Sequence, residues 1–151
     1  MKFFTLFFAT GFGLGYIPIA PGTWGSLLGV ALVYLLMPLS TPLYILTILA
    51  FTAFSIWIST LAEKILRQKD PSKIVIDEIS GILFSFLFVP LSWQTAILGF
   101  LIFRVFDIFK PYPIRKVELK FRRGMGVVLD DVLAGIYTCL VMHLLIAGHF
   151  V

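Results

Sequence analysis

The stretch formed by residues 43–62 is twenty residues long and carries no charged side chain. A helix needs about that length to cross the hydrocarbon core of a bilayer. Four further apolar runs lie at residues 27–39, 74–91, 95–109 and 126–147; the first is uncharged, and each of the other three carries two charged residues. Charged residues make up only 13% of the chain, against about a quarter of a soluble domain. These features predict an all-α protein, a polytopic membrane helix bundle.

The distribution of charge predicts how the bundle lies in the membrane. Two basic segments, 63–73 and 110–123, are expected in the cytoplasm, whereas the turns at 38–42 and 90–94 carry no charge. This pattern predicts about five crossings in a single domain of residues 1–151, with an interfacial or re-entrant segment near the N-terminus. Because the basic residues fall in short segments between apolar runs, we expect no nucleic acid as a partner.

Five acidic residues lie within or beside the apolar runs, each at the expected cytoplasmic end of its helix: Asp77, Glu78, Asp107, Asp130 and Asp131. An unpaired charge near mid-bilayer costs roughly 2.5–3.5 kcal/mol, so these groups have to lie near the interface, pair with cations or bind a metal. Oxygen ligands without an accompanying histidine or cysteine favour Mg²⁺ or Mn²⁺ over zinc. The alternative is ordinary ion pairing, which for Asp107 would involve its neighbours Arg104 and Lys110.

Each acidic pair is followed by a glycine one helical turn later. Gly81 follows Asp77 and Glu78, and Gly135 follows Asp130 and Asp131. Small residues at this spacing let helices approach closely. The spacing therefore predicts that carboxylates from different helices come within reach of one ion, and such surfaces would also permit a homodimer.

The segment PGTWGS, residues 21–26, is expected to be a loop that leads into a helix capped by Thr23 or Ser26. Free amides at such a helix N-terminus favour a phosphate group. The alternative is a simple capped turn in which Gly25 and Gly29 form a packing face, and the spacing alone favours this alternative. Basic residues in the two charged segments, among them Arg122, can likewise orient the chain and contact anionic lipid head groups.

Taken together, these segments resemble those of the phosphatidylglycerophosphatase A family. The resembling segments, in order along nearly the whole chain, are PGTWGS (21–26), DPSKIVIDEISG (70–81), FRVFDIFKPYPI (103–114) and GMGVVLDDVLAG (124–135). The resemblance implies a Mg²⁺-dependent enzyme that converts phosphatidylglycerophosphate into phosphatidylglycerol and inorganic phosphate. Such an enzyme is expected in the inner (cytoplasmic) membrane of a bacterium, as a multi-pass protein among membrane lipids, with its active site facing the cytoplasm.

Cleavage of a phosphomonoester depends on positioning and on neutralising the charge of the transferred group, so we expect three sets of site residues. The expected metal ligands are Asp77, Glu78, Asp107, Asp130 and Asp131. The expected catalytic residues are Asp77, Asp107, Asp130, Asp131 and Lys110. The expected substrate-binding residues are Thr23, Gly25, Ser26, Lys73, Arg104 and Arg115.

A small ion transporter or channel that uses the acidic residues as its pathway is the alternative from another class. It requires polar groups that continue through the bilayer, whereas the acidic residues here are expected at one face only. Two other families of lipid enzymes are disfavoured, because the sequence lacks the PSGH motif of type-2 phosphatidic acid phosphatases and the DG…AR pattern of CDP-alcohol phosphotransferases.

Overall fold

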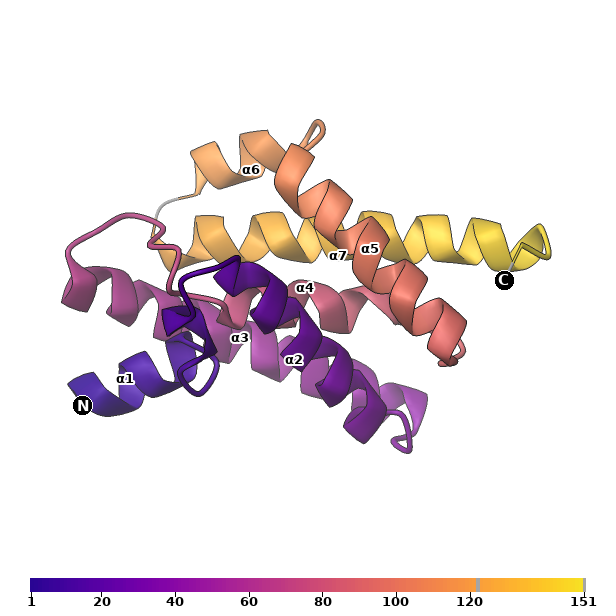
Figure 1. The fold of residues 1–151 in the computed structure, drawn as a ribbon, viewed down its shortest axis with the longest axis horizontal. Coiled ribbons are helices and arrows are strands. Elements are labelled where there is room, and N and C mark those ends of the chain that lie inside the picture. Colours follow the sequence, from indigo (N-terminus) through magenta and orange to yellow (C-terminus); the bar gives the residue numbers. More distant parts are fainter. Residues whose placement is uncertain (122, 151) are drawn as a thin grey trace.

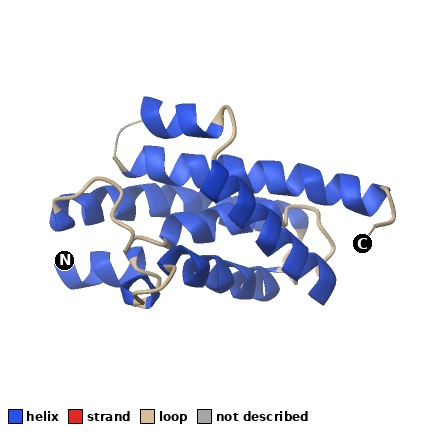
Figure 2. Cartoon of the chain, turned by 45° about the horizontal axis from the view of Figure 1, so that its top comes forward, coloured by secondary structure: helices blue, strands red, loops and turns tan. Residues whose placement is uncertain are grey.

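The structure is a computed structural model, and it describes residues 1–121 and 123–150. Within these residues the chain forms helices joined by short loops and contains no strand, which confirms the all-α prediction (Figure 2). The helices are α1 (Lys2–Ala9), the 3-10 helix η1 (Leu14–Tyr16), α2 (Pro21–Leu36), α3 (Thr41–Leu66), α4 (Ile76–Ser85), α5 (Trp93–Phe109), α6 (Ile114–Lys120) and α7 (Gly124–Ala147).

The centre of the bundle is α4, which lies between α2, α3 and α7 (Figure 1). Eight of its ten residues are buried, and Ile82 and Leu83 join Phe86 and Phe103 in the main hydrophobic core. A helix that neighbours cover on nearly all sides is apolar around its whole circumference. This burial explains why residues 74–91 have the composition of a membrane span.

The number of crossings expected from the sequence is not settled by the lengths of the helices. Two of the described helices, α3 and α7, are long and apolar enough to cross a membrane. In contrast, α2 has 16 residues and α4 has 10, and a ten-residue helix is only about 15 Å long. The bilayer core is about 30 Å thick. The bundle of about five crossings therefore stays a prediction.

The predicted loop at residues 21–26 is wrong, because α2 already begins at Pro21. Proline suits this first helical position, since its fixed φ is helical and its missing N–H would have no helical partner. The residue before it, Ala20, has a φ of 48° and no side chain that can cap the helix. The predicted cap is wrong as well: the Ser26 hydroxyl donates a 2.8 Å hydrogen bond to a carbonyl of the preceding turn.

The basic segment between α5 and α7 is not only a loop, because residues 114–120 form α6, which packs on α7. Arg122 lies outside the described residues.

The N-terminal segment is not one continuous helix, because α1 ends at Ala9 and η1 follows after a turn. Two backbone contacts hold this segment against the loop that precedes α4. The carbonyl of Ala9 accepts a 2.9 Å hydrogen bond from the Val75 amide, and Gly15 lies so close to the Lys73 carbonyl that a Cβ would overlap it. The expected interfacial position of the segment stays a prediction.

Close contact between α4 and α7 depends on two glycines. A Cβ on Gly81 would lie 2.6 Å from the carbonyl oxygen of Asp131, and a Cβ on Gly135 would overlap the carbonyl of Gly81. This confirms that the glycines after the acidic pairs let the helices approach. The contact brings the first turn of α4 next to the acidic turn of α7.

Gly25 and Gly29 form a face of α2 that packs against residues of the same molecule. A Cβ on Gly25 would lie 2.7 Å from the Cβ of Val75, and one on Gly29 would lie 2.9 Å from the Cβ of Ile82. The packing interpretation of these two residues is therefore confirmed. A homodimer stays a prediction, and this small-residue face is already occupied by α4.

Candidate active site

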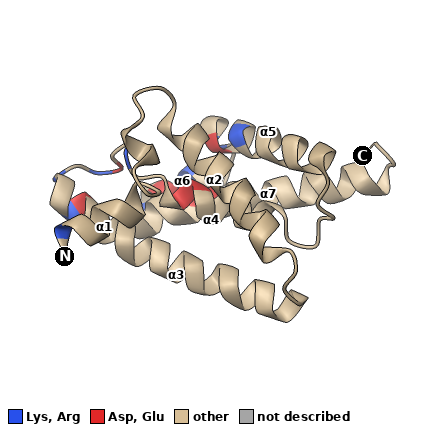
Figure 3. Ribbon diagram, turned by 60° about the horizontal axis from the view of Figure 1, so that its bottom comes forward, with Lys and Arg blue, Asp and Glu red and all other residues tan. Residues whose placement is uncertain are grey.

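A pocket of about 320 Å³ opens where the start of α2, the loop before α4, and the polar ends of α4, α5 and α7 meet. Acidic residues cluster in this part of the ribbon, whereas α3 and α7 each have long stretches without charged residues (Figure 3). The charged residues that line the pocket are Asp70, Asp77, Glu78, Arg104, Asp107, Asp130 and Asp131. The structure therefore brings together all five acidic residues that we singled out from the sequence.

Three of these carboxylates form the acidic triad, which consists of Asp77 and Glu78 in the first turn of α4 and Asp131 in α7. One carboxylate oxygen from each lies within 4.8 Å of the others. Asp77 and Asp131 are buried. Among the described residues, Asp77 Oδ1 and Glu78 Oε2 are buried without a hydrogen-bond partner. A cation shared by these oxygens would satisfy them and offset their mutual repulsion, so the triad could hold a metal ion.

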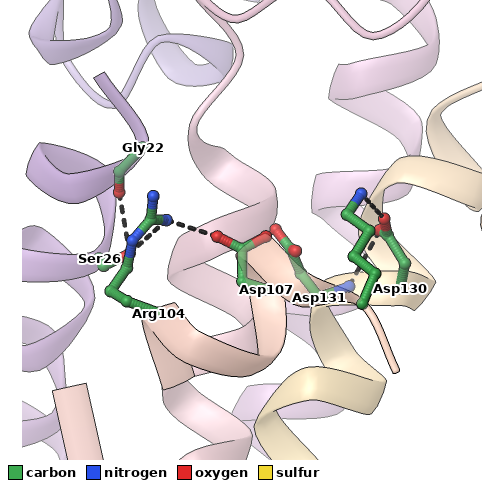
Figure 4. A network of polar contacts seen from close by, with 7 residues as sticks. Gly22, Ser26, Arg104, Asp107, Asp130 and Asp131 are labelled. Carbon is green, nitrogen blue, oxygen red and sulfur yellow. Dashed lines mark hydrogen bonds and ion pairs between the residues drawn. The ribbon is translucent and has the colours of Figure 1, made fainter. Parts of the chain in front are cut away.

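Arg104 links α5 to the first turn of α2 at the edge of the pocket. Its Nη1 donates to Asp107 Oδ2 at 2.5 Å and to Ser26 Oγ at 3.5 Å, while Ser26 donates to the carbonyl of Gly22 (Figure 4). The Asp107 carboxylate lies beside that of Asp131 (Figure 4). Because Arg104 lines the pocket, its guanidinium is placed to bind an anionic group there.

Lys110, the residue after α5, connects two further carboxylates. Its Nζ donates to Asp130 Oδ2 at 2.5 Å and to Glu118 Oε2 at 3.2 Å. The other oxygen of Asp130 accepts a 3.0 Å hydrogen bond from the Asp131 amide (Figure 4). Burial by itself lowers the pKa of Lys110, but the charge and hydrogen bond of Asp130 outweigh this and raise that pKa above the usual lysine value. The lysine therefore stays charged and holds Asp130 in place.

Gly22 is a pocket residue that the sequence reasoning did not assign to the site. A Cβ at this position would overlap the Glu78 carboxylate and lie 3.1 Å from Arg104 Nη1. Glycine is needed here because two charged groups occupy the space that a side chain would fill. The available signal was its place in PGTWGS, next to the proline that starts the helix.

Five of the six predicted substrate-binding residues do not line the pocket; one of them is Ser26, which contacts Arg104 as described above. Gly25 packs inside the bundle, and Thr23 lies one residue beyond Gly22 on α2. Lys73 is exposed, with its Nζ 5.6 Å from the ring centre of Tyr16. Arg115 is exposed on α6. Their role in substrate binding stays a prediction.

The loop before α4 contributes Asp70 and Ser72 to the pocket. The Asp70 amide donates a 2.9 Å hydrogen bond to Glu63 Oε1, which ties this loop to the end of α3. Sequence reasoning missed both residues because the whole segment 63–73 was interpreted as a basic, membrane-orienting loop. Their place at the start of the motif DPSKIVIDEISG was the signal that could have indicated them.

Comparison with known proteins gives one consistent family. The profile of the phosphatidylglycerophosphatase A family matches residues 7–146. Phosphatidylglycerophosphatase A of Haemophilus influenzae is 42% identical over 139 residues, which cover 89% of this chain and 83% of that protein. The Escherichia coli phosphatidylglycerophosphatase A is 34% identical over 142 residues, 93% of this chain and 81% of that protein.

A third relative carries a different name. A putative phosphatidylinositol-3-phosphatase of Bacteroides thetaiotaomicron is 39% identical over 145 residues, which cover 91% of this chain and 90% of that protein. No solved structure matches the chain. Since the family profile covers every element that lines the pocket, the chain belongs to the phosphatidylglycerophosphatase A family and is a phosphatase.

Proposed function

We propose that this enzyme removes the terminal phosphate of phosphatidylglycerophosphate, with Mg²⁺ as its cofactor, and releases phosphatidylglycerol and inorganic phosphate. The observation that carries the proposal is the acidic triad, whose unpartnered oxygens lie in the same pocket as Arg104. The names of the Haemophilus influenzae and Escherichia coli relatives support the choice of substrate.

In the proposed reaction, Asp77, Glu78 and Asp131 hold the ion, which when bound neutralises charge on the phosphate oxygens. Arg104 binds a further phosphate oxygen, while Asp107 and Ser26 orient its guanidinium. These contacts fix the phosphate on the polar side of the pocket.

One of the two paired carboxylates, Asp107 or Asp130, orients the attacking water. The water oxygen bonds to phosphorus as the bond from phosphorus to the glycerol oxygen breaks; the water gives one proton to that carboxylate, and the same proton then passes to the leaving glycerol oxygen. Lys110 holds Asp130 in position through this step.

We further propose that the enzyme is a multi-pass protein of a bacterial inner membrane and that the pocket faces the cytoplasm. Two observations support this placement. Two helices, α3 and α7, are long and apolar enough to cross. The loop before α4 and the end of α5 contribute to the pocket, and both adjoin the basic segments that favour the cytoplasmic side.

Phosphate release from lipid in mixed micelles tests the proposal. We expect phosphatidylglycerophosphate to be hydrolysed faster than phosphatidylinositol 3-phosphate, EDTA to stop the reaction, and Mg²⁺ to restore it. Faster hydrolysis of the inositol lipid would show that the name of the Bacteroides thetaiotaomicron relative is the better guide. Full activity in EDTA would contradict the assigned role of the triad.

An ion transporter or channel is not favoured, because the acidic residues of the pocket gather in one part of the bundle (Figure 3). We expect purified protein in liposomes to give no cation flux above that of empty liposomes, under conditions where the same preparation releases phosphate.

A further inference from the structure

A second hollow, the α2–α5 groove, lies between two of the helices that form the active-site pocket. It has a volume of about 350 Å³, and its lining is entirely apolar: Leu27, Val30, Ala96, Ile97, Phe100 and Leu101. Ala96 is buried, while Leu27, Ile97 and Leu101 are each about half exposed. The groove is therefore open to the surroundings, with apolar walls that no element of the described chain covers.

The groove starts close to the polar pocket and leads away from it. Leu27 and Val30 lie about 7 and 12 Å further along α2 than Gly22, by the rise of a helix. On α5, Leu101 and Ile97 precede Arg104 by about 5 and 10 Å. The two helices lie side by side with opposite chain directions (Figure 1). Moving forward along α2 from Gly22 and backward along α5 from Arg104 therefore leads in the same direction, away from the pocket.

The order of chemistry along this path is polar and then apolar. Arg104 and the acidic triad mark the end that would take a phosphate and its cation. The α2–α5 groove follows directly and offers no hydrogen-bonding side chain among its lining residues. A lipid phosphomonoester has the same order, because its acyl chains follow the head group through the glycerol unit.

We propose that the α2–α5 groove holds one acyl chain of the lipid substrate while the phosphate occupies the active-site pocket. This inference rests on the proposed function, since the phosphate to be hydrolysed is the group that fixes the ligand at the pocket. The polar pocket alone would also accept a water-soluble phosphomonoester. The groove therefore makes the enzyme selective for lipids by binding the part of the substrate that does not react.

Narrowing the groove tests the inference. Val30→Trp and Ala96→Leu add volume to its walls, while Leu46→Trp on α3 is a matched control at an exposed apolar position outside the groove. Each variant would be assayed with long-chain phosphatidylglycerophosphate and with a water-soluble dihexanoyl analogue. We expect kcat/KM for the long-chain lipid to fall about tenfold or more in the groove variants. Turnover of the short-chain analogue, and both activities of Leu46→Trp, should stay close to wild type.

Equal losses on both substrates would overturn the inference, because they would show that the variants disturb the pocket rather than the acyl chain. Unchanged long-chain turnover in both groove variants would overturn it as well, and it would leave the phosphatase assignment intact. Failure of the wild-type protein to hydrolyse either substrate would instead contradict the proposed function.

A binding experiment that does not depend on turnover separates these cases. Phosphatidylglycerophosphate with a diazirine in one acyl chain would be photolysed with the wild-type protein, beside phosphatidylcholine with the same group. We expect the phosphomonoester lipid to label residues 27–30 and 96–101 in clear excess over phosphatidylcholine. Equal labelling by the two lipids, or crosslinks between two protein copies across the groove, would overturn the inference.

Discussion

The acidic triad and the two paired carboxylates line the same pocket but differ in their surroundings. Asp77, Glu78 and Asp131 crowd one small volume, and two of their buried oxygens have no partner among the described residues. Asp107 and Asp130 each contact a cationic side chain instead. Like charges in a buried cluster oppose folding, whereas a cationic partner offsets the cost of burying a carboxylate. The pocket therefore combines a part that needs a cation with a part that already has one.

Neutralising the triad should give the largest loss of activity. We expect Asp77→Asn and Asp131→Asn to lower phosphate release by roughly a thousandfold, because each removes a ligand of the ion that is worth several kcal/mol in the transition state. In EDTA the same variants should unfold at an equal or higher temperature than wild type, since one of the repelling charges is gone. If these variants fold correctly and turn over substrate at nearly the wild-type rate, the triad has no role in the mechanism.

Neutralising a paired carboxylate should lower both activity and stability. We expect Asp130→Asn to reduce activity on the order of a hundredfold. We also expect it to destabilise the fold by about 1–3 kcal/mol, since Lys110 loses a charged hydrogen bond in a largely buried place. Chemical denaturation in detergent measures the second effect. The control is Asp130→Asn combined with Lys110→Met, which should recover part of the stability and none of the activity. If Asp130→Asn instead stabilised the protein, the paired carboxylates would not differ from the acidic triad in their effect on folding.

A methyl group at Gly22 should disturb both groups at once. We expect Gly22→Ala to cost roughly ten- to a hundredfold in kcat, because the new methyl group would overlap Oε1 of the Glu78 carboxylate and displace it, and would press on Arg104 Nη1 at 3.1 Å. Thr23→Ala, one residue along the same helix but outside the pocket, is the matched control and should stay within about threefold of wild type. A comparable loss in Thr23→Ala would support the substrate-binding role that the sequence predicted for Thr23.

The smallest effects are expected at Lys73 and Arg115, which lie outside the pocket. If these residues contact anionic head groups, removing either costs about 1 kcal/mol of surface attraction. We expect Lys73→Ala and Arg115→Ala to raise the apparent KM in anionic mixed micelles by up to about fivefold with unchanged kcat. Raising the salt concentration should remove the difference. A large fall in kcat would instead show that these side chains reach the phosphate during turnover.

The convergence of the acidic residues could be predicted from the sequence because two separate patterns indicate it. Uncharged turns alternate with basic segments, which assigns the acidic helix ends to one side. Gly81 and Gly135 then indicate where α4 and α7 touch, and the structure confirms that contact. Both signals are local sequence patterns, so they can be recognised without knowledge of the tertiary structure.

Other features depend on tertiary contacts that no local pattern records. Residues 74–91 resemble a membrane span, yet α4 ends at Ser85 as a short central helix, because periodicity cannot separate a buried core helix from a span. The division of the acidic residues into a triad and two pairs depends on where Lys110 meets Asp130. These residues are twenty positions apart, so that division required the structure.

The close contact between α4 and α7 makes Gly81 and Gly135 intolerant of substitution. Neither glycine lines the pocket, yet any larger residue there would force the two backbones apart and separate Asp77 from Asp131. In a saturation mutagenesis screen scored by growth, both positions would therefore look as intolerant as the carboxylates themselves. The replacement pattern would tell them apart, since Asp→Glu can spare some function while nothing larger than hydrogen fits at the glycines.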